Sequence, residues 1–181
     1  MEPVSHRFTD LGTCIDELHE LFDAWAAANP FAPALGAYGL EVMRLAVHEW
    51  MANLVQHADF SVSSAVIELA LAPAAQRLRC RIADTSRGFD FEHQLAVQRA
   101  LVKTGFAHGQ PPERGRGLMM LAAFTEGLTY ERLEPHADAE PSNGESPNGA
   151  VPFRQRVEFW IASTGAPPPL APTDDPCRIP F

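Results

Sequence analysis

The longest run of helical periodicity, at residues 38–58, constrains the fold of this chain more than any other feature. Its apolar residues gather on one side when each residue is turned by 100° from the last. They are Leu40, Val47, Trp50, Met51, Leu54 and Ala58. Two apolar runs follow, at 65–71 and 78–83, around a short segment with proline, and they predict a β-hairpin. A long helix beside a hairpin favours a fold of helices packed on a sheet.

Periodicity and turn residues place further elements on both sides of this unit. Further strands are predicted at residues 4–9, 128–133 and 157–162. Further helices are predicted from a cap at Asp10 or Thr13 to Asn29, at 93–102 and at 118–126, with a loop at 31–36. The expected fold is α+β, a two-layer α/β sandwich in which helices cover one face of a mostly antiparallel sheet.

The chain has 181 residues, of which 46% are hydrophobic. This length suits one domain with a core of its own. We expect that domain to span residues 1–164, with a flexible polar insertion at 134–149. A proline-rich tail at 165–181 is expected to be extended or mobile.

Charge and cysteine content exclude several classes of protein. The formal net charge is −9, which argues against general binding of nucleic acid, because that binding depends on lysine and arginine. The three cysteines have the spacing of neither a disulfide framework nor a zinc site. There is no apolar run of spanning length and no signal-peptide pattern, so a cytoplasmic location and no membrane contact are expected.

A first polar constellation lies on the long helix. Glu49, Asn53 and His57 are four residues apart, so they share one stripe of the helix surface. An amide oxygen suits Mg²⁺, and a carboxylate one turn away can accept a proton from a hydroxyl. A solvated polar face would produce the same pattern, and on this segment alone it is the favoured interpretation.

A second constellation, residues 82–90, is an apolar strand that ends in Asp84 before a turn with Gly88. A buried aspartate at a strand end can accept a hydrogen bond from the exocyclic amino group of adenine. An ordinary turn that closes a strand is an equal alternative.

A third constellation is Gly115-Arg116-Gly117-Leu118, at the start of a predicted helix. Glycines at a helix N-terminus let backbone N–H groups approach an anion such as a phosphate. Glycine placed for the turn alone is the alternative.

These three motifs, in this order, resemble those of the anti-sigma-factor serine/threonine kinases, within the superfamily of histidine-kinase-like ATPases. The resemblance extends over about residues 5–163 and rests on three pieces of sequence: Glu-x-x-x-Asn-x-x-x-His-Ala, then Asp-x-x-x-Gly-Phe-Asp, then Gly-Arg-Gly-Leu. Each motif is modest alone, and their agreement in order and spacing makes the set specific.

The resemblance implies a role for each motif residue. Glu49 would be the catalytic base, Asn53 the Mg²⁺ ligand and Asp84 the acceptor for the adenine amino group. Gly88 would shape the floor of the nucleotide site. The ATP lid would span 104–117, and its phosphate-binding residues would be Gly115, Arg116, Gly117 and Leu118. His57 would be structural.

The chain departs from the family pattern at Ser86 and at Gly149-Ala150, and Met119-Met120 and the long insertion at 134–149 are also untypical. Ser86 stands where the usual Asp-x-Gly-x-Gly turn has its first glycine, and a positive φ there would cost a serine about 1–2 kcal/mol. Gly149-Ala150 stands where relatives often have Gly-Thr near the last strand. Weak nucleotide binding is therefore one alternative, in which the chain is a binding module without kinase activity.

The resemblance implies an ATP- and Mg²⁺-dependent kinase in a partner-switching system. It would phosphorylate an anti-anti-sigma protein of the STAS fold and sequester a sigma factor, and it would be a homodimer. A second alternative keeps the kinase and replaces the sigma factor with another target. A fragment of a histidine kinase is disfavoured, because no dimerising helix pair with a phosphoacceptor histidine precedes the motifs.

Overall fold

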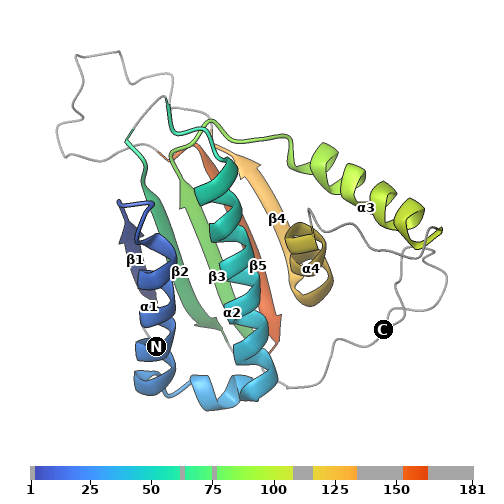
Figure 1. Ribbon diagram of the computed structural model, residues 1–181. Helices are drawn as coiled ribbons and strands as arrows, with labels where there is room; N and C mark the ends of the chain where they lie inside the picture. The colour runs from blue at the N-terminus through green and yellow to red at the C-terminus, as the bar shows by residue number, and fades with distance from the viewer. Residues whose placement is uncertain (1–2, 62–63, 75–76, 108–115, 134–152, 163–181) are drawn as a thin grey trace.

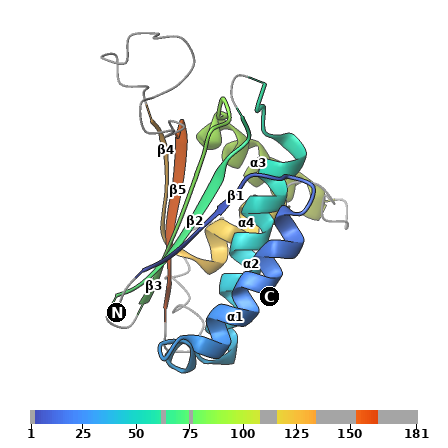
Figure 2. The ribbon, with the colours of Figure 1, turned by 90° about the vertical axis from the view of Figure 1, so that its left-hand side faces the viewer.

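The computed structural model describes residues 3–61, 64–74, 77–107, 116–133 and 153–162. Within these ranges, one antiparallel sheet has the strand order β1-β2-β3-β5-β4, and the helices cover one of its faces (Figures 1 and 2). The strands are β1 (Val4–Phe8), β2 (Ile67–Ala74), β3 (Arg77–Asp84), β4 (Glu126–Arg132) and β5 (Gln155–Ala162). The helices are α1 (Cys14–Ala28), α2 (Ala32–His57), α3 (Phe91–Ala107) and α4 (Arg116–Phe124). The predicted α+β sandwich is confirmed.

Helix α2 runs along the middle of the sheet, with α1 beside it on one side and α4 on the other (Figure 1). Its apolar stripe is buried as predicted, with Val47, Met51 and Leu54 at most 2% exposed. These side chains pack on the inward residues of the two central strands, such as Ile82 and Phe159. Burial of this stripe, at about 25 cal/mol for each Å² of apolar surface, is the main stabilising term of the layer.

The prediction of a loop at residues 31–36 was wrong in part. Residues 32–35 form a helical turn, and α2 is interrupted only at Gly36, where φ is +65° and ψ is 173°. Pro33 favours this turn, because proline is tolerated in the first turn of a helix and has its φ angle already set. Gly36 then adopts the positive φ that reorients the chain before the long part of the helix.

Both ends of the segment expected to form the ATP lid, 104–117, are helical. Helix α3 continues to Ala107, and α4 begins at Arg116. Strands β4 and β5 each begin two residues before their predicted starts, at Glu126 and Gln155. The rest of the lid at 108–115, the insertion at 134–149 and the tail at 165–181 lie outside the described residues.

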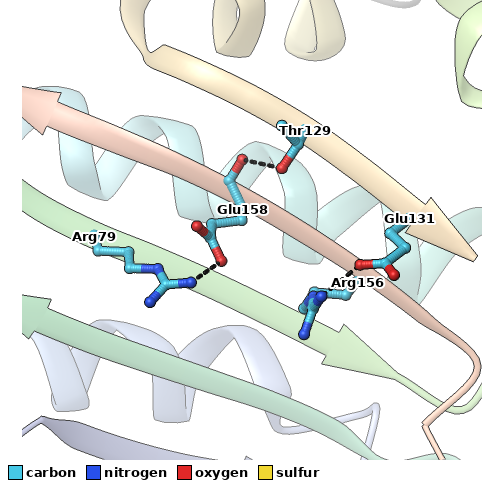
Figure 3. A network of polar contacts seen from close by, with 5 residues as sticks. All are labelled: Arg79, Thr129, Glu131, Arg156 and Glu158. Atoms are coloured by element: carbon cyan, nitrogen blue, oxygen red, sulfur yellow. Dashed lines mark hydrogen bonds and ion pairs between the residues drawn. The ribbon is translucent and has the colours of Figure 1, made fainter. Parts of the chain in front are cut away.

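The outer face of the sheet is not covered by the helices (Figure 2). Side chains of opposite charge face one another across its strands, as Figure 3 shows for two pairs. Arg79 of β3 contacts Glu158 of β5 at 2.5 Å, and Arg156 of β5 contacts Glu131 of β4. No helix in the described part of the chain is long and apolar enough to cross a membrane.

Candidate nucleotide site

A cavity of about 400 Å³ opens between the second half of α2, the segment after β3, and helices α3 and α4. It is lined by Trp50, Asn53, Leu54, His57, Ala58, Ser86, Gly88, Phe89, Gln94, Gln98 and Leu118. All three sequence motifs therefore contribute to its wall. A concave site with a largely apolar lining and a few polar groups is the usual form of a small-molecule site.

Asp84 is the last residue of β3, two residues before Ser86 of the cavity wall, and it is 1% exposed. Its Oδ1 atom accepts hydrogen bonds from the backbone N–H of Ser86 at 3.0 Å and from Nε2 of Gln155 at 2.5 Å. Its Oδ2 atom is buried and has no hydrogen-bond partner among the described residues. A buried acceptor left unpaired is costly, so it points to a donor that a ligand would supply.

The pKa of the Asp84 carboxyl is raised above its ordinary value of 3.8, chiefly because burial disfavours the charged form. The hydrogen bonds from Gln155 and Ser86 act in the opposite direction and stabilise the carboxylate. Perturbed carboxyl groups of this kind are common at functional sites. Asp84 does not itself line the cavity, but the residues of the turn that follow it, Ser86 and Gly88, do.

Gly88 has a φ of +77°, which disfavours any residue with a side chain. A Cβ atom at this position would lie 2.9 Å from the Tyr130 hydroxyl and 3.1 Å from Oε1 of Gln155. Both the backbone conformation and the close approach of these two side chains therefore require glycine. Its place in the cavity wall agrees with the predicted floor of a nucleotide site.

The polar stripe of α2 reaches from the cavity to the start of α4. Asn53 and His57 line the cavity, and Glu49 lies one turn earlier on the helix. A Cβ atom on Gly117 would lie 2.1 Å from Oε2 of Glu49, so this carboxylate packs directly against the first turn of α4. Asn53 and Glu49 are half-buried, so the alternative of a fully solvated face does not describe them.

Helix α4 presents its N-terminus toward α2, its main partner in the layer. Arg116 is its first residue, and Leu118 is 8% exposed and lines the cavity. Backbone N–H groups in the first turn of a helix attract anions, as the third motif predicts. Gly115 lies outside the described residues.

The model of the histidine kinase-like ATPase domain family matches residues 15–138, more than half of the chain. The chain belongs to this family. The matched range contains all three motifs. No curated protein matches the chain closely. Membership supports ATP binding by this chain. The buried Oδ2 atom of Asp84, which no described residue pairs, leaves an acceptor that a donor on a ligand could use.

Ser86 replaces the first glycine of the usual Asp-x-Gly-x-Gly turn, and here it is an ordered part of the cavity wall. Its side chain is fully buried, and its Oγ atom accepts hydrogen bonds from Nε2 of Gln155 and from the backbone N–H of Gly88 at 3.3 Å. The hydroxyl thus occupies the space between the strand end and the turn. Gly149-Ala150, the second departure, lies outside the described residues.

Two residues of this network were missed by the sequence analysis. Gln155 stands directly opposite Asp84 in the pairing of β5 with β3, and Tyr130 of β4 donates its hydroxyl hydrogen to Oε1 of Gln155 at 2.6 Å. A glutamine and a tyrosine in predicted strands carry no signal of their own. Only the strand pairing reveals that Gln155 contacts Asp84 and that Tyr130 contacts Gln155.

Aromatic residues form the wall next to this network. Phe91 stacks on Tyr130 with ring centroids 5.3 Å apart, and Trp50 lies 5.8 Å from Phe89. Trp50 and Phe89 both line the cavity, where a flat base can pack on apolar surface.

The two cysteines in the described part of the chain lie outside the site. Cys14 and Cys80 are unpaired and buried in the core, and burial raises the pKa of the Cys14 thiol to about 11 and that of Cys80 further. Catalytic cysteines have a lowered thiol pKa and are accessible, so neither residue has the properties of a catalytic nucleophile. Among the described residues, no group of three or more histidine, cysteine, aspartate or glutamate side chains could hold a metal ion.

Proposed function

We propose that this histidine kinase-like ATPase domain is a serine/threonine protein kinase of a partner-switching system. It transfers the γ-phosphoryl group of ATP to a STAS-type anti-anti-sigma protein and sequesters a sigma factor. The observation that carries the kinase proposal is the position of Glu49. Its carboxylate lies one turn from Asn53, which lines the cavity, and against Gly117 at the N-terminus of α4.

The adenine base of ATP would lie at the end of the cavity next to Asp84. Oδ2 of Asp84 would accept a hydrogen bond from the adenine amino group, above the floor that Gly88 provides. The rest of the nucleotide would then lie along α2 and α4, which also line the cavity.

The phosphates would lie at the other end, where α2 meets α4. Asn53 would offer its amide oxygen to Mg²⁺, which prefers oxygen ligands and is held largely by the phosphates themselves. Backbone N–H groups of Gly115, Gly117 and Leu118 and the guanidinium of Arg116 would balance the phosphate charge. ATP supplies the phosphoryl group that is transferred.

Glu49 would accept the proton of the partner's serine or threonine hydroxyl as that oxygen bonds to phosphorus and ADP leaves. Phosphoryl transfer needs mainly positioning and charge neutralisation from the protein, so one well-placed carboxylate is sufficient. The packing against Gly117 holds that carboxylate at the helix end.

The experiment combines the protein with Mg-ATP and a STAS-domain protein, and detects phosphoserine or phosphothreonine on the latter. Glu49→Gln keeps the shape of the side chain and removes the base. Glu41→Gln is the matched control, because Glu41 is an exposed glutamate on the same helix, outside the cavity. We expect transfer by wild type and Glu41→Gln, and its loss in Glu49→Gln. No transfer by wild type, or equal transfer by Glu49→Gln, contradicts the kinase proposal.

The partner is tested separately by capturing proteins that bind in the presence of ADP or ATP. Recovery of a sigma factor that the unphosphorylated STAS protein displaces supports the proposed switch. Recovery of a different target instead supports the alternative of a partner-switch kinase without a sigma factor. The expected homodimer, proposed from the family resemblance alone, is checked by measuring the mass in solution.

A further inference from the structure

We infer that Gln155 and Tyr130 are positioning residues for base recognition, which hold Asp84 so that only its Oδ2 atom is free. The site would therefore accept purine nucleotides that carry an amino group at the recognised edge, and reject those with a carbonyl oxygen there. This inference rests on the proposed nucleotide site and adds to it the residues that set base specificity.

The first step is the pairing of Gln155 with Asp84. The two residues are directly opposite in the β3–β5 pair, and each is 1% exposed. Nε2 of Gln155 donates to Oδ1 of Asp84 and to Oγ of Ser86, so the two N–H groups of the amide have two acceptors. With the Ser86 N–H also donating to Oδ1, that oxygen is occupied. The other oxygen is left for a ligand.

The second step is the orientation of the amide. The Tyr130 oxygen accepts a hydrogen bond from the Phe89 N–H at 3.2 Å, and its hydroxyl donates to Oε1 of Gln155 at 2.6 Å. A flipped amide would turn Oε1 toward Oδ1 of Asp84, where two acceptors would face each other. Tyr130 thus selects the orientation in which Gln155 donates to Asp84.

The third step is the position of Tyr130 itself. Its ring is stacked on Phe91 at an interplanar angle of 13°, and the absence of a side chain at Gly88 leaves room for its hydroxyl. The chain of contacts from Phe91 to Asp84 is therefore continuous. It crosses β4 and β5 and ends at Oδ1 of Asp84, next to the unpaired Oδ2.

This arrangement predicts selectivity. When Asp84 is ionised, its Oδ2 atom can accept from an exocyclic amino group, while a carbonyl oxygen at that place leaves both acceptors unpaired. Hydrogen bonds to the carboxylate favour its charged form, so removal of the Gln155 donor raises the pKa of Asp84 further. ATP binding, which needs the ionised form, would then be lost at a higher pH as the solution is acidified. Burial also raises the pKa of Tyr130, and the charged groups that act on it are Asp84, Arg132 and Asp90.

The test uses calorimetric titration of the full chain with Mg-ATP and with Mg-ITP, whose base has a carbonyl oxygen in place of the amino group, at several pH values. Gln155→Met keeps the length of the side chain and removes the amide. Tyr130→Phe removes only the hydroxyl that orients it. Glu158→Gln is the matched control, because it lies on the same strand with its side chain on the opposite face, bonded to Arg79 (Figure 3).

We expect wild type and Glu158→Gln to bind ATP on the order of 100-fold more tightly than ITP. Gln155→Met should lose roughly tenfold in ATP affinity near neutral pH, since a hydrogen bond to a charged group is lost. Its ATP-to-ITP ratio should shrink, and its loss of binding in acid should move to higher pH. Tyr130→Phe should change in the same direction by less, and thermal melting shows that each variant is folded.

The inference is overturned if wild type binds ATP and both variants keep its ATP-to-ITP ratio and its pH profile. Wild type that binds neither nucleotide overturns the proposed nucleotide site as well, so the two failures are distinguishable. A uniform loss of affinity for both nucleotides, with an unchanged pH profile, assigns Gln155 to packing alone and also overturns the inference.

Discussion

The two faces of strand β5 carry polar side chains in opposite circumstances. Gln155 points inward, is 1% exposed and donates to the buried Asp84. Arg156 and Glu158 point outward and form ion pairs across the open face of the sheet, at side-chain exposures of 36% and 19% (Figure 3).

The difference shows where function can be inferred. Ion pairs on the open face of the sheet contribute little to the free energy of unfolding. Water can solvate either charge when its partner is lost. A buried carboxylate with a free oxygen costs stability in the absence of a ligand, so the fold carries it at the expense of its own stability. We therefore place the proposed nucleotide site at the inner network, although the outer face has more charge.

The substitution Asp84→Asn should have the largest effect. The substitution removes the negative charge and replaces one carboxylate oxygen with an NH2 group, which donates and does not accept. ATP affinity should therefore fall by about 100-fold or more. The increase in melting temperature that ATP causes in wild type should then disappear. An undiminished increase would show that Asp84 does not contact the base.

The same variant should be more stable than wild type without ligand near neutral pH. The folded-state pKa of Asp84 is raised above 3.8, so the unfolded state releases its proton first, and stability is lost as pH rises through the folded-state pKa. Asparagine does not ionise, so the variant does not lose this stability as pH rises. The gain in melting temperature should shrink toward acid pH, and a variant less stable than wild type at every pH would contradict this account of the buried charge.

The substitution Gly117→Ala should affect catalysis more than stability. Its Cβ atom would come within 2.1 Å of the Glu49 carboxylate, and the end of that flexible side chain would move away. Displacement of the proposed base should lower the rate of phosphoryl transfer by about 10- to 100-fold, since small misplacements have effects of this size. Transfer assays and melting curves check this, and an unchanged rate would remove Glu49 from the mechanism.

The substitution Gly88→Ala should lower stability and ATP affinity together. Alanine at a φ of +77° costs about 1–2 kcal/mol, and its Cβ atom would also press on the Tyr130 hydroxyl. Gly36→Ala is the matched control, because Gly36 has a φ of +65° with open space around its Cβ position. Denaturant unfolding should give a larger loss for Gly88→Ala, and only that variant should bind ATP more weakly. Equal losses would mean that the contact with Tyr130 has no energetic importance.

The substitution Glu158→Gln should have the smallest effect. Its pair with Arg79 is partly buried, with side-chain exposures of 43% and 19%, but it lies on the open face of the sheet, where an ion pair contributes about 0.2–1 kcal/mol and is screened by salt. The loss of unfolding free energy should therefore decrease as salt is added, and ATP binding should not change. A loss as large as that of Gly88→Ala would contradict the contrast between the two faces.

Much of this architecture could be predicted because it depends on local pattern. The stripe of α2, the hairpin and the burial of Asp84 at a strand end follow from the spacing of apolar residues. The kink at Gly36 could not be placed, because the loop was expected to continue through Pro33, which the first turn of a helix accepts.

The contacts that complete the candidate site depend on distant pairing. Gln155 meets Asp84 only because β5 inserts between β3 and β4, and this order of strands is not visible in local pattern. The contact of Glu49 with Gly117 similarly requires α4 to pack on α2. Glu49 and Gly117 could each be singled out from the sequence. Only the structure shows that glycine is needed at 117 because the Glu49 carboxylate packs against it.

A calorimetric titration of the wild-type protein with Mg-ATP, beside Asp84→Asn and Glu158→Gln, tests the central claim most directly. We predict one saturable site for wild type and Glu158→Gln, and no measurable binding to Asp84→Asn at the same concentrations. Absence of binding to the wild type, or equal binding to Asp84→Asn, would contradict an adenine nucleotide site at Asp84.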